Sequence, residues 1–432
     1  MNAIILSIGD ELILGQTIDT NSAWLSQQLA SHGVDILAHA AVRDDQPAIE
    51  DAIRSAAARC ELLLITGGLG PTEDDLTRQA LAAVLHEPLE LSEKWLTHMQ
   101  SFFQKMNRPM PQRNRLQAMI PRGATMIFNT AGTAAGIDAV YQSGDLKTRC
   151  RIFAMPGVPK EMKAMFADAV VPHITAVAGG AAICSTTLHT FGMGESAIAE
   201  KLGAALMDRS RNPVVGTTVS GGIVSVRITA RFPSQAQAQE QLEKTVADCQ
   251  SALGDLIFGR DEDTLPKVIA DLLKQPGKLA TVATAESCTG GLLAKLLTDR
   301  PGSSTHFQTG WVTYSNAAKH DRLGVSAELI NIYGAVSEPV VEAMAKNARR
   351  LANATYALAI SGIAGPDGGT PTKPVGTVCI ALAERDPADK NNSQIEKRTF
   401  IFPGDRDMIR HRSALMALTM LRYRLLDKPM PF

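Results

Sequence analysis

Residues 283–291 read Ala-Thr-Ala-Glu-Ser-Cys-Thr-Gly-Gly and lie between an apolar run and a segment of helical character. The run Leu279–Ala283 predicts a buried strand, and residues 290–297 predict a helix. The turn between them carries a carboxylate, two hydroxyls and a thiol, from which nucleophilic sites are made. Ser287 in this turn is either part of an ordinary helix cap or a nucleophile at a helix N-terminus, where negative charge is favoured.

The composition bounds the class of protein. The chain has 432 residues, which at roughly 100–200 residues per domain predicts about two to four domains. Its net charge of −1 predicts no general affinity for nucleic acid or for an anionic membrane. The N-terminus lacks signal-peptide features, and no apolar run approaches the ~20 residues that span a bilayer, so we expect a cytoplasmic protein. The six cysteines have no metal-binding spacing, which predicts free thiols.

The first region, residues 1–172, alternates between strand and helix patterns. Apolar runs predict strands at residues 3–8, 34–41 and 62–65, and amphipathic patterns predict helices at 20–31 and 46–60. This βαβαβ order predicts a doubly wound α/β domain with parallel strands.

Ligands of such domains bind beyond the carboxyl ends of the strands, where three loops meet: residues 9–11, 66–75 and 155–161. Gly67, Gly68 and Gly70 let backbone N–H groups approach a ligand closely, which favours a phosphate. Bare carboxylates would repel a phosphate, so a bound phosphate predicts a bridging divalent metal such as Mg²⁺. The expected metal ligands are Asp10, Glu11, Asp74 and Asp75. The alternative is that Glu73, Asp74 and Asp75 only stabilise the first turn of a helix.

The middle region, residues 173–260, predicts a small α+β unit with a hairpin turn at Gly221-Gly222. It contains no recognisable chemistry, and we interpret it as a spacer or an oligomerisation module. Residues 259–263 form a polar hinge before the last region, residues 262–427.

In the last region, a strand at 307–315 is followed by a helix that Asn316 is expected to cap. Lys319 falls in the first turn of this helix, where the helix dipole opposes a cation and lowers the lysine pKa. A neutral lysine can act as general base for a serine. Tyr314 could orient the serine or relay its proton. The alternatives are a solvated lysine and a half-buried core tyrosine.

A strand at 356–360 then runs into a Ser/Gly loop at 361–369, whose exposed N–H groups suit an oxyanion hole or a phosphate. Arg406, ahead of a final helix at 407–426, could hold a phosphate through two parallel hydrogen bonds. The alternatives are a flexible turn and a solvated arginine.

The N-terminal motifs resemble the molybdopterin-binding-like domain of the CinA family. They are Gly9-Asp10-Glu11, Asp19-Thr20-Asn21, Gly67-Gly68-Leu69-Gly70-Pro71-Thr72 with Asp74-Asp75, Gly132-Thr133-Ala134-Ala135-Gly136 and Pro156-Gly157-Val158-Pro159. Ala135 replaces the proline usual in the family. The resemblance implies metal-dependent ADP-ribose pyrophosphatase activity. It places the substrate on Gly67, Gly68, Gly70, Thr72, Pro156 and Gly157.

The C-terminal motifs resemble the CinA C-terminal domain across residues 262–427. They are Glu286–Gly291, Thr313–Lys319, Gly334–Ser337, Ser361–Gly369 and Gly404-Asp405-Arg406. The resemblance implies deamidation of nicotinamide mononucleotide (NMN), without a metal, by Ser287 as nucleophile, Lys319 as base and Tyr314 as assisting hydroxyl. It places the substrate on Glu286, Thr289, Gly290, Ser361, Gly362, Ala364, Gly365 and Arg406.

The expected partners are therefore the nucleotides NMN and ADP-ribose, with no membrane or nucleic acid, and we expect a homodimer. Two other classes of function stay open. One is a binding module for a molybdopterin-like ligand, without a catalytic metal. The other is an accessory protein for DNA uptake or recombination, which only the family's name suggests.

Overall fold

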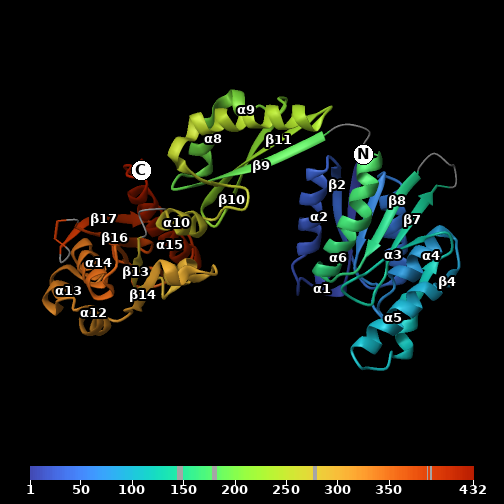
Figure 1. Cartoon of the computed structure of the whole chain (residues 1–432), viewed down its shortest axis with the longest axis horizontal. Coiled ribbons are helices and arrows are strands. Elements are labelled where there is room, and N and C mark those ends of the chain that lie inside the picture. Colours follow the sequence, from blue (N-terminus) through green and yellow to red (C-terminus); the bar gives the residue numbers. More distant parts are fainter. Residues whose placement is uncertain (144–148, 178–181, 276–279, 387, 390–391) are drawn as a thin grey trace. The chain divides into compact units, whose positions relative to one another are not determined.

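The structure is a computed structural model that describes residues 1–143, 149–177, 182–275, 280–386, 388–389 and 392–432 (Figure 1). The chain forms two compact units, Met1–Cys184 with Arg231–Glu240 and Ser185–Ala230 with Gln241–Phe432. The predicted middle region, 173–260, is divided between them. Among the described helices, none has the length and apolar character needed to cross a bilayer.

The first unit is built on one twisted sheet with helices on both faces (Figure 1). Its elements are β1 (Asn2–Ile8), α1 (Asp10–Ile13), α2 (Thr20–Ser31), β2 (Asp35–Val42), α3 (Gln46–Ala57), β3 (Leu62–Thr66), α4 (Thr77–Leu85), β4 (Leu89–Leu91), α5 (Glu93–Lys105), the 3₁₀ helix η1 (Gln112–Ala118), β5 (Met119–Pro121), β6 (Thr125–Ile127), β7 (Gly136–Gln142), β8 (Arg149–Met155), α6 (Pro159–Met165), the π-helix η2 (Phe166–Val170) and α7 (Val171–Val177).

The strand order in this sheet is β2-β1-β3-β8-β7-β6. The first four strands are parallel to one another, which confirms the predicted doubly wound fold. β7 and β6 are antiparallel at the edge, and they were not predicted. Because side chains alternate along each strand, one face packs on α2 and α6 and the other on α3 and α4.

A second, four-stranded sheet has the order β10-β11-β9-β12. The elements of this part of the chain are β9 (Ala182–Phe191), α8 (Glu195–Met207), β10 (Val214–Ser220), β11 (Ile223–Phe232), α9 (Gln235–Leu253), η3 (Gly254–Leu256) and β12 (Ile257–Arg260). Gly221 and Gly222, both with positive φ, join β10 to β11, so the predicted hairpin turn is confirmed.

The C-terminal part is a five-stranded sheet of order β14-β13-β15-β16-β17 between two helical layers. Its elements are α10 (Leu265–Leu273), β13 (Val282–Glu286), α11 (Leu292–Thr298), η4 (Ser303–Thr305), β14 (Phe307–Val312), α12 (Asn316–Leu323), α13 (Ala327–Tyr333), α14 (Glu338–Ala352), β15 (Tyr356–Gly362), β16 (Thr377–Arg385), β17 (Ser393–Ile401) and α15 (Arg406–Leu425). α10, α11 and α15 cover one face, and α12–α14 cover the other.

The central strand β13 lies three residues later than predicted, and Leu279 falls outside the described residues. The shift has a physical cause. Thr284 and Glu286 are fully buried although they are polar, so a prediction based on hydrophobicity ends the strand too early at Ala283.

Candidate active site

Three motifs that are far apart in the sequence meet at one edge of the C-terminal sheet. β13 is parallel to both β14 and β15, so the carboxyl ends of these three strands lie side by side. The strands end at Glu286, Val312 and Gly362. The turn that carries Ser287, the Tyr314–Lys319 segment and the Ser361–Gly369 loop lie at these strand ends. Ligands of α/β proteins commonly bind at this edge of the sheet.

Ser287 and Lys319 form a buried pair at this edge. Lys319 Nζ lies 2.9 Å from Ser287 Oγ. The lysine is 1% exposed and the serine 8% exposed. Burial lowers the pKa of Lys319 below its ordinary value, because desolvation disfavours the ammonium form. The structure therefore brings the predicted nucleophile and base together.

The surroundings of Lys319 suit a neutral amine. Nζ also donates to the carbonyl oxygens of Thr313 at 2.9 Å and Tyr314 at 3.3 Å. A neutral amine has two N–H donors and one lone pair. As an ammonium, Lys319 donates to both carbonyls and to Ser287 Oγ; once it is neutral, the carbonyls accept its two donors and its lone pair can accept from the Ser287 hydroxyl. The helix of Lys319 is capped by Ser315, whose Oγ accepts from Ala318 N, so the expected cap at Asn316 was wrong by one residue.

Glu286 has a different role from the predicted substrate contact. Its carboxylate is fully buried and accepts hydrogen bonds from Gly291 N (3.1 Å), Leu293 N (3.0 Å) and Ala294 N (2.8 Å). Glu286 thus satisfies backbone N–H groups at the N-terminus of α11. Thr289 is itself buried, and its Oγ1 has no hydrogen-bond partner among the residues that the structure describes, whereas Gly290 is exposed with φ +61°.

Tyr314 and Arg406 contact each other at the rim of the site. The Tyr314 side chain is 58% exposed, and its hydroxyl accepts from Arg406 Nη2 at 2.8 Å. Arg406 Nη1 donates to the carbonyl of Gly365 at 2.6 Å. The Tyr314 hydroxyl is thus paired with an arginine, and Arg406 links the two loops that border the Ser–Lys pair.

The Ser361–Gly365 loop divides into a structural and an open part. The Ser361 hydroxyl donates to the carbonyl of Ala335 at 2.7 Å, and Gly362 pairs with Val378 in the sheet. Beyond this point Ala364 and Gly365 are buried, and among the described residues no acceptor faces their N–H groups. Ser361 and Gly362 therefore build the loop, and Ala364 and Gly365 carry the free donors.

Cys288, next to the serine, is a poor nucleophile. It is 5% exposed, and burial raises the pKa of its thiol to about 12. The thiolate, which is the reactive form, is scarce at neutral pH. All six cysteines are free, as predicted.

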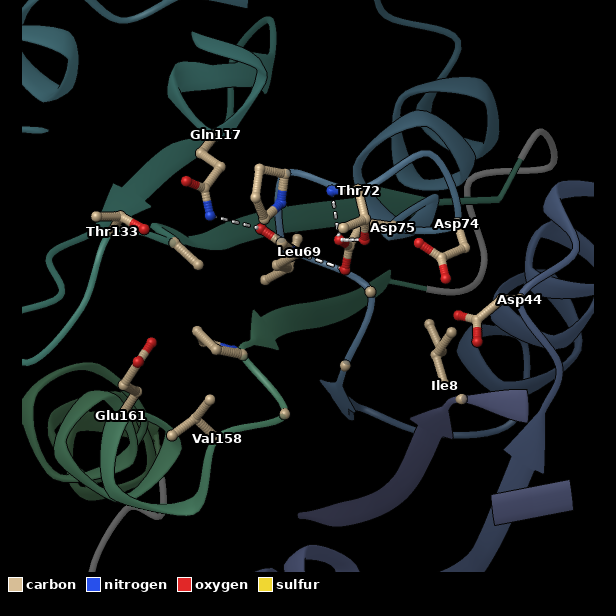
Figure 2. A pocket seen from close by; sticks show the side chains of 18 of the residues that line it. Ile8, Asp44, Leu69, Thr72, Asp74, Asp75, Gln117, Thr133, Val158 and Glu161 are labelled. Atoms are coloured by element: carbon tan, nitrogen blue, oxygen red, sulfur yellow. Dashed lines mark hydrogen bonds between the residues drawn. The ribbon is translucent and has the colours of Figure 1, made fainter. Parts of the chain in front are cut away.

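The carboxyl edge of the first sheet holds a cavity of about 450 Å³ (Figure 2). Its walls come from the loops after β1, β2, β3 and β8, together with Gln117, Thr133 and Ala134. They include the predicted residues Glu11, Gly67, Gly68, Gly70, Thr72, Asp74, Asp75, Pro156 and Gly157. Gly67 is required by the fold itself, since it has φ +104° and a Cβ there would lie 2.2 Å from the carbonyl of Ile8.

The four predicted metal ligands do not gather into one cluster. Asp75 turns inward and accepts from Gly70 N (2.7 Å) and Thr72 N (2.8 Å), which shapes the loop (Figure 2). The carboxylate of Asp10 accepts from Asp44 N at 3.3 Å and does not line the cavity. Over the part of the chain that the structure describes, no three His, Cys, Asp or Glu side chains are placed to hold a metal ion by themselves.

Residues 73–75 also lie outside a helix, because α4 begins only at Thr77. The alternative interpretation of these acids as first-turn helix residues was therefore wrong. The loop is stabilised from within, by Asp75 and by the buried Arg78, whose Nη2 donates to the carbonyl of Leu69 at 3.0 Å.

Asp44 is a cavity residue that sequence reasoning missed. It follows β2, and its side chain lies near that of Asp74 on one side of the cavity (Figure 2). Burial raises the pKa of Asp44, and the negative charges of Asp10, Glu11 and Asp74 raise it further. The sequence feature that could have identified Asp44 is its position just after a predicted strand, which places it at the same sheet edge as Asp10.

The fold and the two sites define a multidomain α/β protein with a buried Ser–Lys pair at one sheet edge and an acidic cavity at another. Three family models match the chain: "Probable molybdopterin binding domain" over residues 4–176, "Damage-inducible protein CinA KH domain" over 185–259 and "CinA C-terminal domain" over 262–425. The KH-like character of the middle region was not predicted from the sequence.

Relatives match over nearly the whole chain. A "CinA-like protein" of Synechococcus sp. (strain CC9902) is 41% identical over 98% of this chain and 98% of its own. A "CinA-like protein" of Geobacter sulfurreducens is 39% identical over 99% of this chain and all of its own. The chain therefore belongs to the CinA family. A crystal structure of "competence/damage inducible protein CihA from Agrobacterium tumefaciens" is 39% identical over 38% of this chain and 93% of its own, with a TM-score of 0.34.

Proposed function

We propose that the C-terminal domain deamidates NMN to nicotinate mononucleotide and ammonia. The observation that carries the proposal is the 2.9 Å contact between Lys319 Nζ and Ser287 Oγ, at a buried position that lowers the pKa of the lysine. Hydrolysis of a carboxamide needs a nucleophile and a base that later returns the proton to the leaving amine. The Ser–Lys pair has both groups, and the family resemblance supports NMN as the substrate.

The reaction proceeds in two halves. Ser287 Oγ attacks the carboxamide carbon while Lys319 takes the hydroxyl proton, and a tetrahedral oxyanion forms. Lys319 then gives this proton to the nitrogen as the C–N bond breaks, which releases ammonia and leaves an ester on Ser287. Water attacks the ester with Lys319 again as base, and the carboxylic acid leaves as Ser287 Oγ recovers its proton.

Two features would hold the substrate. The free N–H groups of Ala364 and Gly365 are donors suited to the oxyanion. Arg406 is exposed and now bonds two neutral acceptors, Gly365 O and the Tyr314 hydroxyl. The phosphate of NMN offers charged oxygens, which form stronger bonds with a guanidinium.

The test is release of ammonia from NMN by the purified chain. We expect turnover in the wild type, a loss of about 10³-fold or more in Ser287→Ala, and retained activity in EDTA. Ser304→Ala, an exposed serine in η4, is the matched control. Absence of turnover in the wild type, or full activity of Ser287→Ala, would reject the proposal.

For the first unit we propose metal-dependent cleavage of the pyrophosphate of ADP-ribose. The specific observation is the gathering of acidic side chains at a 450 Å³ cavity, where burial and, to a smaller extent, the negative charges of Asp10, Glu11 and Asp74 raise the pKa of Asp44. The residues suit Mg²⁺, since this ion is usually held by only one or two carboxylates together with substrate phosphates. Asp44 and Asp74 would hold the ion, and the ion would neutralise charge on the pyrophosphate. The cavity loops would bind and orient the nucleotide.

The matching experiment is cleavage of ADP-ribose to AMP and ribose 5-phosphate with and without Mg²⁺. We expect cleavage only with added metal. Tight binding of ADP-ribose with no cleavage under any divalent cation would instead favour a ligand-binding module.

We expect no general binding of nucleic acid. KH domains clamp the nucleic-acid backbone with a Gly-x-x-Gly loop, and residues 185–259 contain no glycines at that spacing. The net charge of −1 also argues against a general affinity for nucleic acid. Salt-dependent binding of labelled duplex DNA at low ionic strength would contradict this expectation.

A further inference from the structure

The carboxylate of Glu286 joins the nucleophile turn to the helix that follows it. It is completely buried, and its two oxygens accept three backbone N–H groups, those of Gly291, Leu293 and Ala294. Hydrogen bonds to an ionised acceptor are about twice as strong as neutral ones. The orphan N–H groups at the start of α11 are thereby satisfied by a side chain of the residue that directly precedes Ser287.

The main chain of Glu286 reaches the base as well. Its carbonyl accepts from Thr313 N at 2.8 Å, and the carbonyl of Thr313 accepts from Lys319 Nζ at 2.9 Å. Lys319 Nζ then contacts Ser287 Oγ at 2.9 Å. The contacts form a closed ring, from Glu286 through Thr313 and Lys319 to Ser287 and back along the chain. A shift of the turn at Glu286 would therefore change the distance between the nucleophile and its base.

We propose that Glu286 is a positioning residue. Its carboxylate locks the turn so that Ser287 Oγ stays on Lys319 Nζ, and it occupies the start of α11, so the negative charge that develops on the substrate is received elsewhere. This inference rests on the proposed role of Ser287 as nucleophile. It replaces the expectation that Glu286 contacts the substrate.

The three hydrogen bonds to the start of α11 require a carboxylate on a side chain of this length. Glutamine has the same shape, but it has one oxygen acceptor and an NH₂ donor, so at least one backbone N–H would face another donor. Aspartate keeps the charge and both oxygens but is one methylene shorter, and it would restore only part of the bonding.

The test separates positioning from substrate binding. A misplacement of about 1 Å can cost about 10²-fold in rate, so we expect Glu286→Gln to lower kcat for NMN about 100-fold with KM within about twofold. Glu286→Asp should be intermediate. The matched control is Glu328→Gln, an exposed acid in the first turn of α13. A raised KM with unchanged kcat would mean that Glu286 holds the substrate, and would overturn the proposal.

A second readout does not depend on the substrate. A fluorophosphonate probe labels an activated serine, and Ser287→Ala sets the background. We expect labelling of Ser287 to slow about 100-fold in Glu286→Gln and about 10-fold in Glu286→Asp, with far-ultraviolet circular dichroism retained. If Glu286→Gln fails to fold, Glu286→Asp carries the test. Labelling at the wild-type rate in a folded variant would overturn the proposal. Labelling of Ser287 without turnover of NMN would show a wrong substrate, and the effect of Glu286 on labelling would still decide this inference.

Discussion

The two sheet edges differ in how complete their chemistry is. At the C-terminal edge, Ser287 and Lys319 are buried and already in contact, and two backbone carbonyls accept from the lysine. At the N-terminal edge, Asp44, Asp74 and Glu11 line an open cavity, and the charges of Asp74 and Glu11 act on Asp44 to raise its pKa beyond the effect of burial. Under the proposed functions, the first edge would begin acyl transfer with its own side chains, whereas the second would need a cation to bring a phosphate to its carboxylates. The same position in an α/β sheet therefore supports two kinds of site, and the local side chains decide which.

The largest effect is expected from removing Lys319, the proposed general base of the C-terminal site. Lys319→Met removes the amine but keeps an unbranched side chain, and we expect kcat for NMN to fall about 10³-fold. Activity of the wild type should rise with pH as Lys319 loses its proton, at a pH below the ordinary lysine value of 10.5, because burial lowers its pKa. A pH profile of kcat checks this, and a flat profile would exclude Lys319 as the titrating base.

The same lowered pKa predicts a stability effect of definite sign. Below the folded-state pKa, Lys319 is charged in both states, and the desolvation penalty of the native state is fully present. As the pH rises towards 10.5, the unfolded chain binds more protons than the native one, so the free energy of unfolding increases. Lys319→Met should lose this increase in a urea titration at several pH values. An equal increase in the variant would assign it to other groups.

The next effect concerns the acidic cavity. Asp44→Asn removes the charge that its neighbours oppose, so we expect weaker metal activation, with the Mg²⁺ concentration for half-maximal ADP-ribose cleavage raised about 10-fold or more. The control is Asp51→Asn, an exposed acid of α3. Unchanged metal dependence would remove Asp44 from the site, and NMN turnover should stay the same in both variants.

A smaller effect tests the rim of the C-terminal site. Tyr314→Phe deletes the hydroxyl that accepts from Arg406, and an exposed hydrogen bond of this kind is worth about 1 kcal/mol. We expect KM for NMN to rise about fivefold with kcat within about twofold, if Tyr314 acts only by holding Arg406. If kcat instead fell about 100-fold, the predicted role of Tyr314 as an assisting hydroxyl would be supported. Tyr333→Phe, at another exposed tyrosine, is the control.

The smallest effect is expected at Cys288. Cys288→Ser should leave kcat for NMN within about twofold, since the thiol is buried and its pKa is raised to about 12. The variant should lose about 1–3 kcal/mol of unfolding free energy, because the added hydroxyl enters an apolar cluster. Denaturant unfolding measures this loss. A collapse of activity without loss of stability would make the cysteine the nucleophile.

Local patterns in the sequence were sufficient for most of the helices and for the parallel strands. The failures have a common cause. Thr284 and Glu286 belong to a buried strand although they are polar, and neither the three-residue edge strand β6 nor its neighbour β7 was recognised from the sequence. Asp44 could not be assigned, since its importance depends on the charges of Asp74 and Glu11, which come from other loops.

Sequence alone determined the α/β class, the positions of the three loop motifs and the residue types from which a Ser–Lys site can be made. Tertiary structure alone decided which of these side chains meet. Parallel pairing of β13 with β14 and β15 brings residues 32 positions apart into contact. Burial then lowers the pKa of Lys319, and three backbone N–H groups at the start of α11 donate hydrogen bonds to the carboxylate of Glu286. Distance, desolvation and competition for hydrogen bonds arise only once the chain is folded.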